Sequence, residues 1–207
     1  MRLISRSIST SGLLGLVTLV FLLNLSGGGI AYGQSPWDGY TPTEKQMAIA
    51  GFTDCYRSQS SNKNAFVDTD LISAIRVIDE SAKANGLPFA NVILRSLEKS
   101  PLTKPDPHGE RWDGPTGFHT GLWWRGVENS ERQAYIQGIV WCIQAPGVSA
   151  RMMNASSEAI VMKLNDWYVV TDDDWKDPRS KARVDISVIA ALQKIEILCF
   201  KGLTKNK

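Results

Sequence analysis

Glu44-Lys-Gln-Met-Ala-Ile-Ala-Gly-Phe-Thr-Asp-Cys55 returns 87 residues later as Glu131-Arg-Gln-Ala-Tyr-Ile-Gln-Gly-Ile-Val-Trp-Cys142. Five of the twelve positions are identical, and they include one glycine and the closing cysteine of each copy. Three further pairs match at the same offset: Trp37/Trp124, Arg76/Lys163 and Asp79/Asp166. An internal repeat of this kind predicts that the chain contains two copies of one small structural unit.

Each copy is predicted to begin with a helix. Thr43-Glu-Lys-Gln46 and Ser130-Glu-Arg-Gln133 both have the form of a capping box, in which a hydroxyl side chain caps the helix and a glutamine three residues later reaches back. Gly51 and Gly138 fall in the middle of these helices, where a glycine costs about 1 kcal/mol relative to alanine. We therefore expect another backbone to approach closely at both glycines.

Two more helices are expected in each copy. In the first copy they cover residues 69–83, capped by Asp68 or Thr69, and residues 88–99. In the second copy they cover residues 156–168 and residues 178–198, and Asp177 caps the last of these helices. The offset between the copies grows from 87 to 95 residues in the last helix, so about eight residues were inserted before that helix. Val169-Val170 has the composition of a short strand, but it has no evident partner. The predicted fold is all-α, with two repeated three-helix units packed as one compact helical domain. The predicted boundaries are 34–99 for the first repeat, 100–126 for a connection and 127–207 for the second repeat.

The connection is long and irregular, and it is rich in proline, glycine and aromatic residues. Loops of this length without regular structure are uncommon, and they tend to be functional or disordered. The connection holds several large rings that can anchor it, which makes disorder the weaker interpretation. We expect its surface from Pro105 to Trp124 to face a ligand or partner. The candidate binding residues are Trp112, Phe118, His108, His119 and Trp123.

Residues 1–33 have the pattern of a bacterial secretory signal. Arg2 and Arg6 give a positive start, an apolar run follows, and Ala31-Tyr-Gly33 supplies small residues for cleavage after Gly33 or, alternatively, after Ala31. The apolar run of about fourteen residues is shorter than the roughly 20 that a spanning helix needs, which disfavours an uncleaved anchor. We expect a periplasmic or secreted protein without stable membrane insertion after cleavage.

Charge and cysteine content restrict the possible partners and cofactors. Removing the two signal arginines from the 23 basic residues leaves 21 against 21 acidic ones, which disfavours a nucleic-acid partner. Three cysteines remain, Cys55, Cys142 and Cys199, and an oxidising compartment favours bridging two of them. Their spacing matches no zinc motif, and we predict no cofactor or bound metal.

Both histidines lie in the connection, near two carboxylates. His108, Glu110, Asp113 and His119 have the chemistry of a metal site or of acid–base catalysis. Their spacing matches no motif with a known mechanism, and the simpler interpretation is that both histidines are surface or capping residues. The chain contains no nucleophile elbow and no glycine-rich phosphate loop, so we predict no catalytic residues in the leading interpretation.

The second copy resembles the Rap/Tai-like immunity proteins of type VI secretion. The matching elements are Ala134-Tyr-Ile-Gln-Gly138, Cys142-Ile-Gln-Ala-Pro-Gly-Val148, Asp177-Pro178, Ala190-Ala-Leu192 and a closing Cys199, over about 70 residues. The resemblance implies a small, exported, disulfide-bonded helical module that sequesters a cell-wall-degrading effector in the periplasm. It also implies a Cys142–Cys199 bridge that leaves Cys55 free and buried. This chain departs from the pattern because its module is duplicated and Lys104 stands where the first copy would need the closing cysteine. A Cys55–Cys142 bridge remains the rival pairing, and it requires the two first helices to cross near their C-terminal ends.

The leading functional hypothesis is therefore an exported, non-catalytic protein-binding module of the immunity or inhibitor type. The alternatives are a small envelope hydrolase or metal-dependent enzyme that uses His108, Glu110, Asp113 and His119, and a structural component of the envelope.

Overall fold

The computed structural model describes residues 36–59, 66, 69–82, 87–100, 118–168 and 182–200. In chain order the elements are η1 (Pro36–Gly39), α2 (Pro42–Gln59), α3 (Leu71–Ala82), α4 (Phe89–Lys99), α5 (Gly121–Gly126), α6 (Asn129–Ile143), β1 (Ala150–Met152), α7 (Ser157–Tyr168), α9 (Val188–Lys194) and β2 (Leu198–Phe200). The chain divides into two compact units, Met1–Asp38 and Gly39–Lys207, and every element from α2 onward lies in the second. The predicted signal, residues 1–33, lies outside the described residues. None of the described helices is long and apolar enough to cross a membrane.

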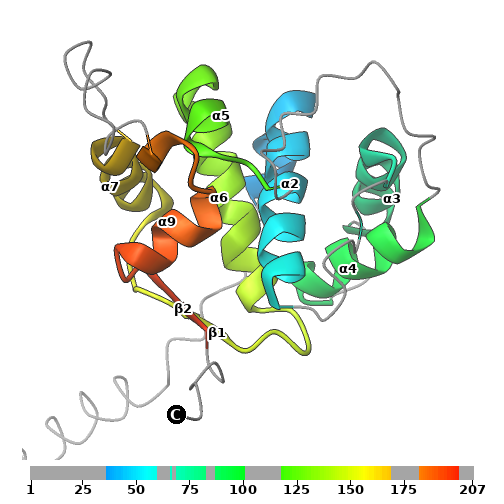
Figure 1. The fold of residues 1–207 in the computed structure, drawn as a ribbon. Coiled ribbons are helices and arrows are strands. Elements are labelled where there is room, and N and C mark those ends of the chain that lie inside the picture. Colours follow the sequence, from blue (N-terminus) through cyan, green and yellow to red (C-terminus); the bar gives the residue numbers. More distant parts are fainter. Residues whose placement is uncertain are drawn as a thin grey trace, which may run out of the picture. The chain divides into compact units, whose positions relative to one another are not determined.

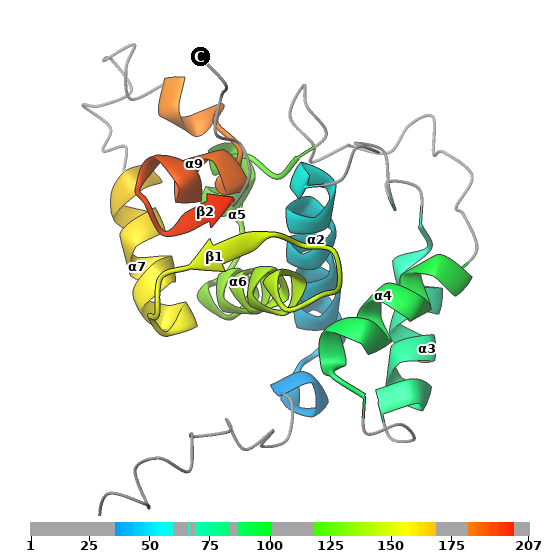
Figure 2. The same cartoon turned by 90° about the horizontal axis from the view of Figure 1, so that it is seen from below.

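The described residues are mainly helical, which confirms the predicted fold class at that level. α2 and α6 lie at the centre, with α3 and α4 beside α2 and with α7, α9 and the small sheet beside α6 (Figures 1 and 2). α2 is central because residues 48–55 are all buried, so neighbours surround the helix instead of covering one face.

α2 and α6 approach each other at the two glycines of the repeat. A Cβ added at Gly51 would overlap the carbonyl oxygen of Tyr135, and a Cβ added at Gly138 would overlap the carbonyl oxygen of Ala48. The contact is reciprocal, because each glycine faces the residue three positions before the other glycine. The predicted close approach of a second backbone at Gly51 and Gly138 is confirmed, since only glycine leaves room for it.

We expect Gly138→Ala to lower the free energy of unfolding by roughly 2 kcal/mol or more. The gain of about 1 kcal/mol in helix propensity is outweighed by the overlap with Ala48 and by a contact of 2.9 Å with the amide nitrogen of Phe52, because neither backbone group can move alone. Gly126→Ala is the matched control, since nothing lies within 4 Å of its Cβ position. Urea unfolding of both variants decides the point, and equal stability of the two would contradict the close crossing.

Cys55 and Cys142 form a disulfide, with their Cα atoms 6.2 Å apart. Cys199 is free and exposed on β2. The predicted Cys142–Cys199 bridge is therefore wrong, and so is the prediction that Cys55 is free. The rival pairing is the correct one, because the crossing of α2 and α6 brings the ends of both helices together.

The starts of α2 and α6 lie earlier than the sequence pattern predicted. The Thr41 backbone amide donates to Glu44 Oε2 at 2.7 Å, and the Glu44 amide donates to Thr41 Oγ1 at 3.2 Å. In α6, Glu128 is the N-cap and Glu131 accepts from its backbone amide at 2.9 Å. The caps predicted at Thr43 and Ser130 are therefore two residues too late. In α2 the reason is Pro42, which fits the first helical position directly after Thr41.

Replacing Glu44 by glutamine should lower stability by less than about 1 kcal/mol, because Glu44 supports an exposed cap. The hydrogen bond from the Thr41 backbone amide lowers the pKa of Glu44. A lowered pKa means that the contribution is present above the unfolded-state pKa and is lost as the pH falls through the folded-state value. Thermal unfolding at neutral and acidic pH measures it, with Glu98→Gln in the last turn of α4 as control. A Glu44 variant that loses the same stability at both pH values would contradict this role.

The later helices agree with the predictions except at the C-terminal end. α3, α4 and α7 lie within or against the predicted ranges, although α3 is capped by Asp70, which accepts from the amides of Ile72 and Ser73. The helix predicted over 178–198 is wrong in extent: α9 covers only Val188–Lys194, with Ser187 as its cap. The helix ends where Glu196 adopts a positive φ of 59°, and Leu198 then enters β2.

A small antiparallel sheet was not predicted from the sequence. β1 pairs with β2 so that Ala150 faces Phe200, Arg151 faces Cys199 and Met152 faces Leu198. Strands of three residues are too short to show an alternating pattern, which explains the omission. The strand expected at Val169-Val170 lies outside the described residues.

Candidate functional site

A buried carboxylate, Asp54 of α2, joins three parts of the chain. The Tyr135 hydroxyl on α6 donates to Asp54 Oδ2 at 2.6 Å. The same oxygen accepts from the backbone amide of His119 at 3.2 Å and lies 2.8 Å from His119 Nδ1. Asp54 is 2% exposed, so these donors replace the water that an ionised carboxylate would otherwise need.

Arg57 supplies the positive charge next to this carboxylate. It lies one turn further along α2, with one guanidinium nitrogen 3.7 Å from Asp54 Oδ1, and both side chains are buried. The guanidinium carbon also lies 4.5 Å from the centre of the Phe118 ring. Arg57 therefore balances the buried charge and holds Phe118 by a cation–π contact.

His119 is held by its ring and by its main chain. Its ring packs edge-on against Trp123 and Tyr135, with centroids 4.4 and 5.5 Å away. On the other side, the His119 carbonyl accepts from the amide of Val188 at 2.8 Å, and Thr120 forms a single β-bridge with Ser187. The segment 118–121 is thus fixed between α2 and the residues that precede α9.

The carboxylate of Asp54 selects the tautomer of His119. An ionised Asp54 only accepts hydrogen bonds, so Nδ1 carries the proton and the lone pair of a neutral ring is on Nε2. Burial raises the pKa of Tyr135 well above its ordinary value, and the charge of Asp54 raises it further, so the phenol stays protonated and donates. An imidazole oriented in this way has the geometry of a general base, although its side chain is only 15% exposed.

The structure describes only some of the predicted site residues, and it places these in different surroundings. His119 and Phe118 lie at the Asp54 cluster, whereas Trp123 is only 4% exposed and packs against Tyr135. The prediction that Trp123 faces a partner is therefore wrong, because this ring belongs to the core. The other candidates lie outside the described residues: Trp112, His108, Glu110 and Asp113. Within the part of the chain that the structure describes, no group of three or more His, Cys, Asp or Glu side chains is arranged to hold a metal ion.

Asp54 and Tyr135 were missed by the sequence analysis. The available signal was the repeat itself: Asp54 stands on the buried part of α2, at the position where the second copy has Trp141. A charged residue where its twin is apolar indicates a specific buried partner. Comparisons of the chain with protein-family models, with curated proteins and with solved structures find no match.

Proposed function

We propose that this chain is an exported, non-catalytic protein-binding module of the immunity or inhibitor type. The observation that carries the proposal is the attachment of the connection to a rigid base. One part of it, residues 118–121, is tied by Asp54 to α2 and α6, the two helices that a disulfide joins. A segment fixed in this way loses little conformational entropy on binding, which favours affinity for a protein partner.

The module consists of two copies of a three-helix unit, α2–α3–α4 and α6–α7–α9. Three relations between the copies support this organisation. The disulfide joins residues that are equivalent in the repeat, and the glycine contacts between α2 and α6 are reciprocal. In addition, Lys45 bonds Asp79 on α3 at 2.7 Å, while its equivalent Arg132 bonds Asn165 on α7 at 3.3 Å.

Export is supported by the predicted signal and by the disulfide. Disulfides persist in the periplasm and outside the cell, and they are rare in the cytosol. The resemblance of the second copy to Rap/Tai-like immunity proteins adds the partner class, a cell-wall-degrading effector. Cys199 is exposed and unbridged, so the immunity hypothesis stands on the helical motif and not on the cysteine pattern of that family.

The partner-facing surface is the connection from Pro105 onward, with Trp112, Phe118, His108 and His119 as its contact residues. Aromatic side chains supply large contact areas at a low cost in conformational entropy. Of these residues, Phe118 and His119 lie at the Asp54 cluster, which joins them to α2 and α6.

The test uses the exported protein as bait for envelope proteins, followed by a peptidoglycan-clearing assay with whatever is captured. We expect a captured hydrolase to be inhibited by the bait. Combined Trp112→Ala and Phe118→Ala exchanges should weaken binding at least about tenfold while the protein stays folded, with only the small loss of stability that follows from the missing Arg57–Phe118 contact. Met162→Ala is the control, because Met162 is 62% exposed on α7 and is not one of the proposed contact residues. Binding that survives the double exchange would refute the surface, and a collapsed fold would show that the segment is core.

The second candidate is a small envelope hydrolase, and the Asp54–His119 pair specifically favours it. A carboxylate on Nδ1 orients the ring so that Nε2 can take a proton from water, as in acid–base hydrolysis. His108, Glu110 and Asp113 would complete that site. Peptidoglycan digestion by the purified protein, abolished by His119→Gln, would select this candidate over the binding module. A structural envelope component would show neither activity nor a captured effector.

A further inference from the structure

One turn of α2 carries both the disulfide and the carboxylate that holds His119. Cys55 follows Asp54 directly in the chain and is bonded to Cys142 of α6. Asp54 accepts from the Tyr135 hydroxyl of α6 at 2.6 Å and lies 2.8 Å from Nδ1 of His119. The hydrogen bonds around Asp54 therefore include the same two helices that the disulfide joins, and they depend on the separation of these helices.

The disulfide sets how closely the two helices approach at this turn. Bonded sulfur atoms lie about 2 Å apart, whereas unbonded heavy atoms in contact lie about 3.5–4 Å apart. Reduction of the bridge therefore requires roughly 1.5–2 Å of additional space between the two sulfurs. Cys55 and Cys142 are fully buried, so this space has to come from the helices and side chains around them.

The hydrogen bonds of Asp54 tolerate little of that movement. The O–H···O bond from Tyr135 is 2.6 Å long, and such bonds weaken beyond about 3.0 Å. The amide nitrogen of His119 is already 3.2 Å from the same oxygen, at the upper end of the normal range for this kind of bond. The backbones of α2 and α6 also touch at Gly51 and Gly138, so the helices cannot move closer there to compensate. A displacement of about 1 Å between the helices is enough to break these hydrogen bonds.

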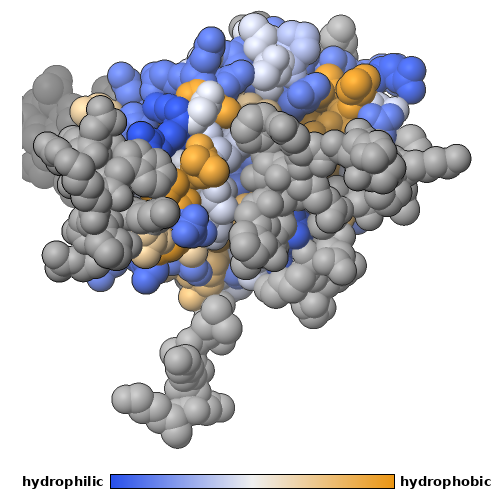
Figure 3. Space-filling view, turned by 45° about the horizontal axis from the view of Figure 1, so that its top comes forward, coloured by the Kyte–Doolittle hydropathy of each residue, from blue (hydrophilic) through white to orange (hydrophobic). Residues whose placement is uncertain are grey.

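The exposed surface favours recognition through individually placed side chains. On the face shown in Figure 3, hydrophobic residues lie in separate patches between hydrophilic ones. Interaction sites that rely on apolar area alone expose one large patch instead. Phe118 and His119 are placed side chains, because Arg57 contacts the Phe118 ring and Asp54 binds His119. Both anchoring residues lie within two positions of Cys55.

We propose that the Cys55–Cys142 disulfide is a redox switch for the binding surface: the oxidised chain holds Phe118 and His119 against α2 and α6, and the dithiol chain releases them. This role rests on the proposed function, in which both residues contact the partner. In the switching step the two thiols lose two protons and two electrons and form the S–S bond, while a disulfide of an envelope oxidoreductase accepts both and becomes two thiols. A chain in the reducing cytosol therefore lacks its fixed binding surface, and it gains this surface after export.

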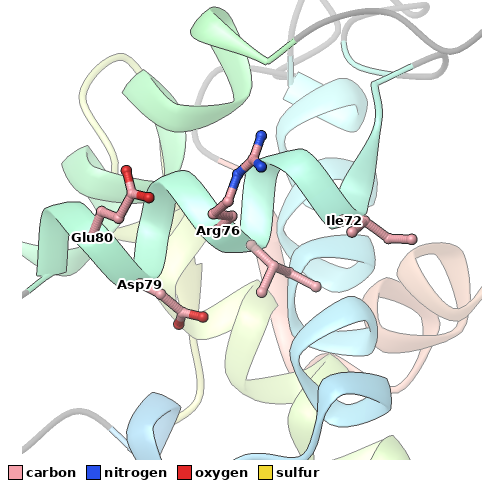
Figure 4. A pocket seen from close by; sticks show the side chains of 5 residues that line it. Ile72, Arg76, Asp79 and Glu80 are labelled. Atoms are coloured by element: carbon pink, nitrogen blue, oxygen red, sulfur yellow. The ribbon is translucent and has the colours of Figure 1, made fainter.

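Once the chain has folded, the bridge is protected from reduction. Thiol–disulfide exchange requires a thiolate to reach one of the bridged sulfurs, and both cysteines are 0% exposed. The surface hollow on α3, about 410 Å³ in volume, contains neither of them. It is lined by Ile72, Ile75, Arg76, Asp79 and Glu80 (Figure 4). The bridge therefore forms during export and persists in the folded protein when a reductant is present.

The test follows the His119 ring in three forms of the exported chain, all with Cys199→Ser to prevent mixed disulfides. The first is the oxidised chain. The second is the dithiol chain, which is unfolded in urea with dithiothreitol and then refolded in the reductant. The third carries Cys55→Ala and Cys142→Ala, so it lacks both the bridge and the two crowded sulfurs. A stabilising osmolyte keeps all three forms folded, and far-UV circular dichroism verifies the fold.

The measured quantity is the rate at which the Nδ1 proton of His119 exchanges with water, taken from ¹⁵N-edited spectra of the imidazole rings. His108→Gln assigns the signals, because the chain has two histidines. We expect the rate to be at least about tenfold higher in the dithiol chain than in the oxidised chain, since the contact with Asp54 is open. The alanine pair should exchange as slowly as the oxidised chain, although it has lost the same cross-link.

Several results would overturn the proposal. A dithiol chain with the exchange rate of the oxidised chain shows that the bridge does not control the contact. Fast exchange in both the dithiol chain and the alanine pair shows that lower stability, and not the separation of the sulfurs, is responsible. If both forms unfold, the bridge holds the whole fold and not this contact. None of these measurements involves a partner, so the capture of an effector tests the proposed binding function separately.

Discussion

Replacing Cys142 by serine is expected to lower the free energy of unfolding by about 4–5 kcal/mol. The bridge to Cys55 spans 87 residues, and closing a loop of this length restricts the unfolded chain by roughly that amount in the entropy model. Both cysteines are fully buried, so a serine hydroxyl at either position also loses water without gaining a defined partner. A loss of this size is comparable to the whole stability of many small domains. The variant should therefore melt at a much lower temperature.

Cys199→Ser is the matched control. Cys199 is exposed and unbridged, so its exchange should change stability by no more than about 0.5 kcal/mol. Peptide mapping without reducing agent should recover a fragment that joins the segments around residues 55 and 142. A fragment that joins 142 to 199, or equal melting of the two serine variants, would contradict the bridge.

The repeat made the centre of the fold predictable but not the cysteine pairing. Two helices related by an approximate two-fold axis meet at equivalent positions, which is why Gly51 and Gly138 make reciprocal contacts. The same symmetry brings Cys55 to Cys142. The resemblance to modules with a closing cysteine pointed instead to Cys199, whose strand lies away from this crossing. Symmetry within the chain was the better guide, because it follows from the packing of this chain itself.

Local signals located the helices but not all of their ends. Thr41 and Pro42 define the start of α2 more strictly than the hydroxyl of Thr43, because proline fits the first helical position and the Thr41 hydroxyl accepts from the amide of Glu44. In the second copy, the apolar periodicity continued past residue 194, although a positive φ at Glu196 ends the helix and β2 follows. A pattern of apolar residues does not distinguish a longer helix from a helix followed by a buried strand.

The candidate site was predictable only in part, because its members are far apart in sequence. His119 and Phe118 stood out as residues of an unusual connection. Asp54 lies 65 residues earlier and Tyr135 lies 81 residues after Asp54, so no local motif joins them. Their meeting depends on the crossing of α2 and α6, which is a tertiary feature.

Replacing Asp54 by alanine is expected to lower the free energy of unfolding by about 3–5 kcal/mol. The exchange removes the acceptor of the Tyr135 hydroxyl and of two His119 donors, and it removes the carboxylate that lies 3.7 Å from the buried Arg57 guanidinium. Leaving several buried donors without an acceptor costs more than the hydrogen bonds contribute net, and the Arg57 charge loses one of its partners, which is why the effect exceeds that of losing any one hydrogen bond.

Two further variants serve as comparisons for Asp54→Ala. Tyr135→Phe keeps the ring and removes only its hydroxyl, so a loss of about 1–2 kcal/mol is expected. Asp166→Ala, at an exposed position of α7, should be nearly neutral. Urea unfolding gives all three values, and ¹⁵N chemical shifts of the His119 ring report its tautomer. An Asp54→Ala variant that unfolds like Asp166→Ala, or a neutral His119 ring in the wild-type protein whose only proton is on Nε2, would show that this carboxylate does not hold the connection in place. With Asp54 in place, residues 118–121 remain fixed between α2 and the start of α9, and that fixed segment is the base on which the proposed binding surface depends.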